Sequence, residues 1–159
     1  MNVWMYKILL FSLIFLTLDQ LSKWFVVFYL ELKQKLYLNL NNQFINFYMA
    51  WNKGINFGLF EGDSVLQAYI LTTVAVVISI IFFIWLRNST SVLIQILASL
   101  VIGGALGNAI DRLMYGAVAD FINVTCCGLR NPYSFNLADI FIFMGLIGIL
   151  IFRFEDKQN

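Results

Sequence analysis

The sequence predicts a membrane α-helical protein with four transmembrane helices and a small β-sheet at the membrane surface. Composition is the first reason: 61% of the 159 residues are hydrophobic and 12% are charged, against about 45–50% and about 25% in soluble domains. The apolar residues also fall into four long runs. Between the first two runs, polar and apolar residues alternate, which is typical of strands. We expect a single membrane domain, residues 1–159.

The charge balance and the missing residue types exclude several classes of function. A net charge of +1 leaves no basic surface for a nucleic-acid partner. The chain has no histidine, which excludes Ser-His-Asp and Cys-His catalysis and removes the commonest metal ligand. Cys126 and Cys127 are adjacent, and neighbouring cysteines rarely form an unstrained disulfide or, without histidine, a zinc site. We expect no metal and no cofactor.

The first apolar run, from about residue 6 to residue 30, is long enough to cross a hydrocarbon core of about 30 Å as a helix. It lacks the short apolar stretch and cleavage site of a secretory signal peptide, so we expect a retained helix. Asp19 and Lys23 lie four residues apart and share a helix face. Such a pair either neutralises itself so that the helix inserts, or supports a buried polar site.

Residues 31–64 are the segment for which we predict the sheet. Leucines at positions 36, 38 and 40 alternate with Tyr and Asn, the period of a strand. Asn41-Asn42 suits a turn, and the aromatic run 43–51 suits a second strand at the membrane interface. In the loop 52–58, two glycines permit unusual backbone angles or close backbone approach, although an ordinary loop is equally compatible.

The second apolar run, residues 65–86, has the features of a plain membrane span. The third, residues 92–114, carries glycines at positions 103 and 107, the GxxxG spacing that lets membrane helices pack closely. Asn108, Asp111 and Arg112 follow. On a helix Asn108 can reach either neighbour, whereas Asp111 and Arg112 point apart and need partners elsewhere. Arg112 also suits the interface, where its charge can snorkel.

Two further aspartates lie where apolar runs meet the connection between them. Asp120 is near the start of this connection, residues 115–135, which we expect to be a loop. Asp139 lies in the first turn of the fourth run, residues 136–152, for which Asn136 is a good N-cap. Asp139 therefore either completes a capping arrangement or serves chemistry, because carboxylates at the edge of hydrocarbon are costly unless used.

Asp120 and Asp139 are the candidate catalytic pair. If the two carboxyl groups meet, they share one proton. The ionised partner can then activate water, while the protonated partner polarises a carbonyl and later protonates the leaving amine. This is peptide hydrolysis, and a surface sheet would position an extended substrate by strand pairing. Two alternatives stay open here: a transporter with Asp19, Asp111 and this pair as ion sites at mid-bilayer depth, or a non-catalytic packing subunit.

The motifs and their order resemble the bacterial lipoprotein signal peptidases, also called signal peptidase II. The matching stretches are LDQLSK at 18–23, NKGINFG at 52–58, GGALGNAIDR at 103–112, VADFI at 118–122 and FNLAD at 135–139. Five motifs in this order, over essentially the whole chain, are highly specific. There are two small departures from the family pattern: Ala119 stands where Val is usual, and Ile55-Asn56 replaces small residues.

The resemblance implies an intramembrane aspartyl endopeptidase with Asp120 and Asp139 as its catalytic dyad. It implies cleavage of prolipoproteins before the diacylglyceryl-modified cysteine of the lipobox. Nine further residues fall on the family's motif positions and would bind substrate or support the dyad: Asp19, Lys23, Asn52, Gly54, Asn108, Asp111, Arg112, Asn136 and Ala138.

The resemblance also implies a cellular setting. The protein is expected in the bacterial inner (cytoplasmic) membrane, with both termini cytoplasmic and the active site and β-sheet, the β-cradle, toward the periplasm. The expected partners are the prolipoprotein substrate, membrane lipid and the inhibitor globomycin, and a monomer suffices for the chemistry. Basic residues divide almost evenly between the two sides, so charge alone does not set the orientation.

Overall fold

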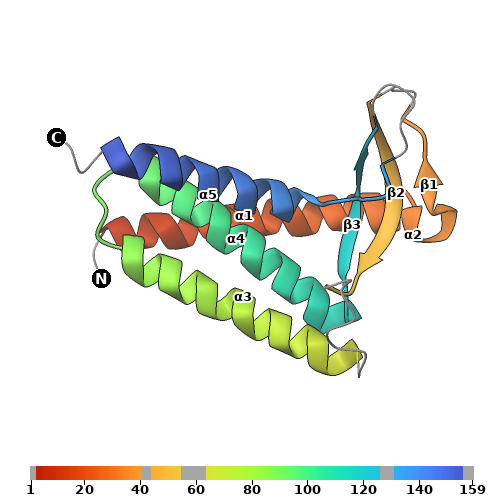
Figure 1. Ribbon diagram of the computed structural model, residues 1–159, viewed down its shortest axis with the longest axis horizontal. Coiled ribbons are helices and arrows are strands. Elements are labelled where there is room, and N and C mark those ends of the chain that lie inside the picture. Colours follow the sequence, from red (N-terminus) through yellow and green to blue (C-terminus); the bar gives the residue numbers. More distant parts are fainter. Residues whose placement is uncertain (1–2, 41–43, 55–63, 126–130, 156–159) are drawn as a thin grey trace.

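The computed structural model describes residues 3–40, 44–54, 64–125 and 131–155. Four helices run alongside one another in a bundle (Figure 1): α1 Val3–Lys23, α3 Ser64–Leu86, α4 Val92–Tyr115 and α5 Leu137–Glu155. The expectations for Asn41-Asn42, Ile55-Asn56, Gly58 and the two cysteines lie outside the described residues.

Three of these helices are long and apolar enough to cross a membrane: residues 4–29, 65–86 and 92–115, with mean hydropathies of 1.5, 2.5 and 1.9. The first of them continues beyond α1 as a π-helix, η1 Trp24–Tyr29, which the sequence did not reveal. The expected fourth span corresponds to a shorter apolar helix, Leu137–Phe152. At about 1.5 Å per residue its length is about 24 Å, somewhat less than a hydrocarbon core of about 30 Å.

Helix α4 is the centre of the bundle, because it packs against α1, α3 and α5. Its glycines make this packing close. A Cβ on Gly103 would lie 2.7 Å from the backbone oxygen of Ser12 in α1, and a Cβ on Gly104 would lie 2.6 Å from that of Ala138 in α5. The expected role of the small residues in helix packing is therefore confirmed, since larger side chains would push the neighbouring helices away.

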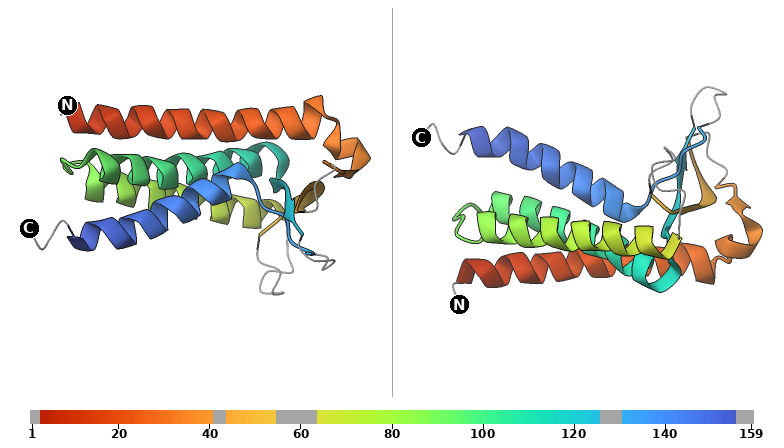
Figure 2. Two further views of the ribbon diagram at one scale, coloured as in Figure 1. Left: turned by 90° about the horizontal axis from the view of Figure 1, so that it is seen from above. Right: turned by 60° about the horizontal axis from the view of Figure 1, so that its bottom comes forward.

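A three-stranded antiparallel sheet lies at one end of the bundle (Figures 1 and 2). Its order is β1 Tyr37–Leu38, β2 Ile45–Asn52 and β3 Val118–Val124. The first and last described residues of the chain lie at the opposite end (Figure 1). The sheet is therefore separated from the chain ends by the length of the bundle.

The third strand corrects the expectation of a loop over residues 115–135. β3 pairs with β2 along most of its length and buries nearly every side chain, so its sequence lacks the alternation that marks a half-exposed strand. The predicted first strand is also shorter than expected. Residues 32–35 form a single helical turn, α2, bounded by positive φ angles of 58° at Glu31 and 61° at Leu36.

One face of the sheet packs against η1 and α2. Val27 and Leu32 meet Met49 of β2 and Phe121 of β3 in a buried cluster. Apolar burial there holds the sheet onto the end of the bundle. The opposite face of β2 carries Asn52, whose side chain contacts Asp120 of β3.

Candidate active site

Asn136 connects the two candidate catalytic aspartates. Its side-chain amide donates to Asp120 Oδ1 at 2.6 Å, and its backbone N–H donates to Asp139 Oδ2 at 3.1 Å. The backbone N–H of Asp139 donates in return to Asn136 Oδ1 at 3.1 Å. This reciprocal capping begins α5, as the N-cap prediction expected. It also brings a carboxylate from β3 and one from α5 to the same residue.

Two other asparagines donate to the remaining carboxylate oxygens. Asn108 in α4 donates to Asp139 Oδ1 at 2.9 Å, and Asn52 at the end of β2 donates to Asp120 Oδ2 at 3.0 Å. The Asn52 amide is held because its Oδ1 accepts the N–H of Gly54 at 2.8 Å. Every oxygen of the two carboxyl groups thus accepts an amide N–H, which fixes the orientation of both groups.

Lys23 lies behind this pair, almost fully buried. Its ammonium group is 2.8 Å from Asp19 Oδ2 and 2.8 Å from Asp111 Oδ2. It also donates to Asn108 Oδ1 at 2.9 Å. Because that oxygen accepts from Lys23, the amide nitrogen of Asn108 is directed toward Asp139. The Asp19–Lys23 pair is therefore part of a buried polar site rather than a self-neutralising pair alone.

Asp19 and Asp111 each hold a second element of the site. Asp19 Oδ1 accepts the backbone N–H of Ala138 at 3.0 Å, which ties the start of α5 to α1. Asp111 Oδ2 accepts the backbone N–H of Ala119 at 3.1 Å, which ties β3 to α4. These two backbone groups neighbour Asp139 and Asp120 in the sequence. The two buried acids therefore fix the backbone on which the candidate pair is carried.

Arg112 lies beside the pair, with its Nη1 3.4 Å from the backbone oxygen of Asn108. Its Nε is buried and has no hydrogen-bond partner among the described residues. Its charge acts on Asp120 and Asp139 as well as on Asp111. The guanidinium is therefore part of the polar site and does not simply snorkel to the interface.

Asp120 carries the pKa shift expected of one member of a carboxyl pair. Burial, and then the nearby carboxylate of Asp139, raise the pKa of Asp120 from 3.8 to about 6. Hydrogen bonds from Asn52 and Asn136 oppose this shift without cancelling it. At mildly acidic pH Asp120 therefore retains a proton beside a neighbouring carboxylate, the arrangement needed to divide acid and base roles.

Two glutamines in this region were missed by the sequence analysis. Gln20 donates to Asp111 Oδ1 and to the backbone oxygen of Gly107, both at 3.1 Å. Gln67 of α3 donates to the backbone oxygen of Gly54 at 2.6 Å. A polar amide within an apolar run indicates a buried polar contact. In the first run, the charges of Asp19 and Lys23 are the stronger indication of such a site.

All eleven candidate residues named from the sequence gather at the sheet end of the bundle. Asp19, Asp111, Asp120 and Asp139 are linked through shared partners rather than spread along a path. This is the arrangement expected of a catalytic centre and not of the ion path that the transporter alternative requires. Among the described residues, no group of three or more Cys, Asp or Glu side chains is arranged to hold a metal ion.

Comparison with known proteins identifies one family. A family model described as signal peptidase (SPase) II matches residues 11–155. A lipoprotein signal peptidase of Rhodopseudomonas palustris (strain TIE-1) is 38% identical over 145 residues, covering 89% of this chain and 88% of the relative. One from Methylorubrum extorquens (strain PA1) is 38% identical over 136 residues, covering 86% and 78%. One from Rickettsia conorii (strain ATCC VR-613 / Malish 7) is 41% identical over 144 residues, covering 89% and 69%.

Two solved structures, both described as bacterial membrane enzymes, share the fold. The structure at 1.9 Å resolution matches with a TM-score of 0.74 and 26% identity over 91% of this chain and 90% of the other. The structure at 2.3 Å resolution matches with a TM-score of 0.68 and 26% identity, covering 94% and 88%.

Proposed function

The chain belongs to the signal peptidase II family, and on that basis we propose that it removes signal peptides from prolipoproteins by aspartyl catalysis. The proposed cleavage lies immediately before the diacylglyceryl-modified cysteine. The observation that carries the mechanism is that Asp120 and Asp139 both accept a hydrogen bond from Asn136.

In the proposed reaction Asp120 carries the shared proton and Asp139 begins ionised. Asp139 accepts N–H bonds from Asn108 and from the backbone of Asn136, partners suited to a carboxylate. It removes a proton from water as the water oxygen attacks the scissile carbonyl. Asp120 donates a hydrogen bond to the developing oxyanion. The C–N bond then breaks as Asp120 passes its proton to the leaving nitrogen, which releases the cysteine amino group. The proton on the new carboxyl group of the signal peptide returns to Asp120, and Asp139 releases the proton that it took from water, which restores the pair.

The remaining buried residues are proposed to position the dyad rather than to react. Lys23 directs Asn108 toward Asp139, while Asp19 and Asp111 hold the backbone beside each catalytic residue. Arg112 adds a positive charge that limits the repulsion between the two carboxylates. Gly54 and Ala138 contribute backbone N–H groups to the same network.

The setting in the membrane is part of the proposal. We place the protein in the bacterial inner membrane with four spans, α5 being the fourth, with cytoplasmic termini and the sheet toward the periplasm. The apolar exposed surfaces of α1 and α3 support a lipid environment. A substrate with its signal helix in the bilayer would meet the dyad where the spans end. The family also implies globomycin as an inhibitor and membrane lipid as a partner, and one chain carries the complete polar site.

The direct test is turnover of a diacylglyceryl-modified lipobox peptide by the purified protein in detergent. Wild type should release a product that begins at the lipidated cysteine. Asp120→Asn and Asp139→Asn should remain folded and lose turnover. Glu31→Gln is the matched control, because Glu31 is an exposed acid that pairs with Lys35 and lies outside the polar site.

Two outcomes would contradict the proposal. If Asp120→Asn and Asp139→Asn both cleave at the rate of Glu31→Gln, the dyad assignment is wrong. If wild type leaves a verified lipidated substrate intact, the activity itself is wrong, and proton-flux measurements on vesicles containing the protein become the next experiment.

A further inference from the structure

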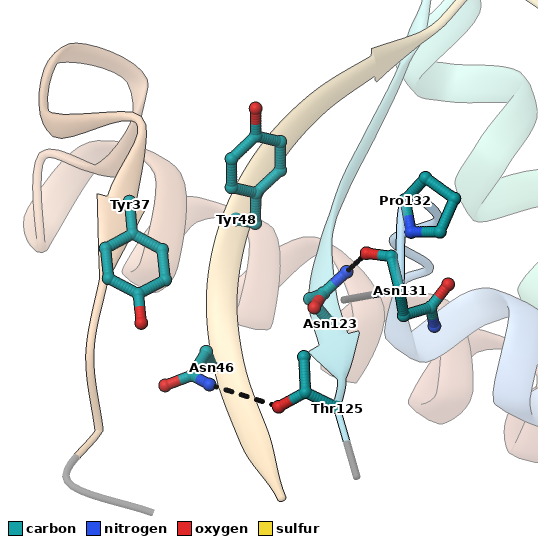
Figure 3. Close-up of a pocket in the computed structure, with 7 residues that line it drawn as sticks. All are labelled: Tyr37, Asn46, Tyr48, Asn123, Thr125, Asn131 and Pro132. Atoms are coloured by element: carbon teal, nitrogen blue, oxygen red, sulfur yellow. Dashed lines mark hydrogen bonds between the residues drawn. The ribbon is translucent and has the colours of Figure 1, made fainter. Parts of the chain in front are cut away.

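A polar groove lies on the sheet beyond the candidate dyad (Figure 3). It encloses about 740 Å³ and is lined by Tyr37 of β1, Asn46 and Tyr48 of β2, Asn123 of β3, and Thr125, Asn131 and Pro132 after β3. Its volume lies within the range of about 300–1,000 Å³ typical of ligand sites. None of these residues belongs to the polar site around Lys23.

The lining is uncharged and rich in hydrogen-bonding groups. The asparagines supply amide donors and acceptors, and the two tyrosines supply aromatic faces and hydroxyl groups. Asn46 donates weakly to Thr125 at 3.5 Å, while its Oδ1 is buried and has no hydrogen-bond partner among the described residues. A buried acceptor left unpaired is unfavourable. A peptide N–H entering the groove would satisfy it.

The groove and Asp120 share one face of the sheet. Phe47, Met49 and Trp51 of β2 belong to the apolar cluster beneath the sheet, so the intervening residues point to the other face. Asn46 of the groove pairs with Asn123, and Ala50, four residues further along β2, pairs with Asp120. At about 3.3 Å per residue, Asn46 therefore lies about 13 Å along β2 from Ala50, the partner of Asp120, and Tyr48 lies about half as far.

We propose that this groove binds the first residues of the mature lipoprotein, downstream of the lipidated cysteine. The inference rests on the function proposed above. The upstream part of the substrate is an apolar signal helix, and an open groove of Asn and Tyr residues does not suit it. The downstream part is an extended chain leaving the membrane, and about four residues of it span the distance to Asn46. Neutral asparagines recognise its backbone, so binding depends on the length of the downstream chain rather than on one sequence.

The test compares two lipidated peptides with the same signal segment. The short peptide ends one residue after the lipidated cysteine, and the long one continues for about six further uncharged residues, enough to cross about 13 Å. Wild type should show a lower KM for the long peptide. Tyr48→Ala should raise the KM for the long peptide about tenfold and leave the short peptide and both kcat values unchanged.

Tyr133→Ala is the matched control. Tyr133 is 72% exposed and does not line the groove, so the same truncation there should change neither KM. Tyr48 is 51% exposed, so its loss should not disturb the core. A lower melting temperature in Tyr48→Ala with equal KM changes for both peptides would indicate a structural effect and overturn the assignment.

A charge substitution provides an independent readout. Asn46→Asp should lower the KM for a long peptide bearing lysines downstream and raise it for one bearing glutamates, with no change for the short peptide. If wild type cleaves long and short peptides with equal KM and neither substitution separates them, the groove does not bind the substrate although the peptidase activity stands. If wild type cleaves neither peptide, the proposed function fails first, and the inference fails with it.

Discussion

Lys23 holds the polar site together, because two buried carboxylates converge on its ammonium group. Lys23→Met would leave Asp19 and Asp111 buried without their cation. Breaking a buried pair in this way costs about 3–5 kcal/mol, so we expect a large loss in the free energy of unfolding, measured by chemical denaturation in detergent. Turnover should fall as well, since Asn108 loses one of the two donors to its Oδ1, Lys23 and Asn136, that orient its amide nitrogen toward Asp139.

Lys35→Met is the control for this prediction. Lys35 also pairs with an acid four residues away, Glu31 at 3.2 Å, but both side chains are more than half exposed. Exposed pairs contribute about 0–1 kcal/mol, so this variant should unfold close to wild type. Equal destabilisation by Lys23→Met and Lys35→Met would show that the buried cation is not essential to the fold.

The raised pKa of Asp120 predicts how the stability and the activity of the free enzyme depend on pH. Its folded pKa of about 6 lies above its ordinary value of 3.8, so the folded protein disfavours the ionised form. Stability from this group is therefore fully present below about pH 4 and is lost as pH rises through about 6. The proposed acid loses its proton over the same upper range, so kcat/KM should fall above about pH 6, as a property of the coupled pair.

The measurement is a kcat/KM profile with a neutral substrate, together with melting temperatures across the same pH range. Asp120→Asn should lose the change in melting temperature between about pH 4 and pH 6, whereas Glu31→Gln should retain it. A kcat/KM that keeps rising beyond pH 7 would contradict Asp120 as the acid.

The polar residues of the site could be predicted from the sequence, but the contacts between residues on different helices could not. The spacing of Asp19 and Lys23 predicts their contact on one helix. The contact between Lys23 and Asp111 joins α1 to α4 and depends on the register at which the two helices pack. Gly103 permits that register by bringing α4 against the backbone of α1. Helical period alone does not contain this information.

At the scale of elements, the helices were predictable and the strand that carries Asp120 was not. Long apolar runs specify spans by length alone, whereas β3 is covered on both faces and shows no alternation. The π-helix η1 likewise lies inside a continuous apolar run, WFVVFY, where no residue marks the change of helical period. Asn52 and Asp120 meet only because β2 and β3 pair, so this contact required the structure.

Packing between α4 and α5 should control the geometry of the dyad. A Cβ at Gly104 would lie 2.6 Å from the backbone oxygen of Ala138 and 2.9 Å from Ile142. Ala138 adjoins Asp139, so Gly104→Ala must move the start of α5. We expect a loss of about 1–3 kcal/mol in the free energy of unfolding and a lower kcat, measured on the same purified protein.

Gly148→Ala is the matched control within α5. The three atoms nearest to its added Cβ all belong to the side chain of Leu97, whose flexible end can move aside. Gly148 also lies about two and a half helical turns from Asp139, at about 3.6 residues per turn. This variant should retain wild-type kcat and most of its stability. If Gly148→Ala lowers kcat as much as Gly104→Ala, bundle packing in general, and not the start of α5, sets the catalytic geometry.

At the scale of the whole molecule, the bundle has two ends. If its four helices all span the membrane, these ends lie on opposite sides of it. The chain ends and the α3–α4 connection lie at one end, and the sheet lies at the other (Figures 1 and 2). Tyr133, near the sheet, is 72% exposed, and Ser89 lies in the α3–α4 connection. Each position can therefore carry a cysteine that reports its side.

In intact spheroplasts, a membrane-impermeant thiol reagent should label Tyr133→Cys and should label Ser89→Cys only after the membrane is permeabilised. The background for both is Cys126→Ser with Cys127→Ser, so that only the introduced thiol reacts. Because α5 is the shortest of the four apolar helices, a third cysteine at Phe152, near its far end, tests whether it crosses. Labelling of Phe152→Cys in intact spheroplasts would mean that α5 returns to the periplasmic side. In that case Asp139 would be held by a re-entrant segment, and the four-span topology would be wrong.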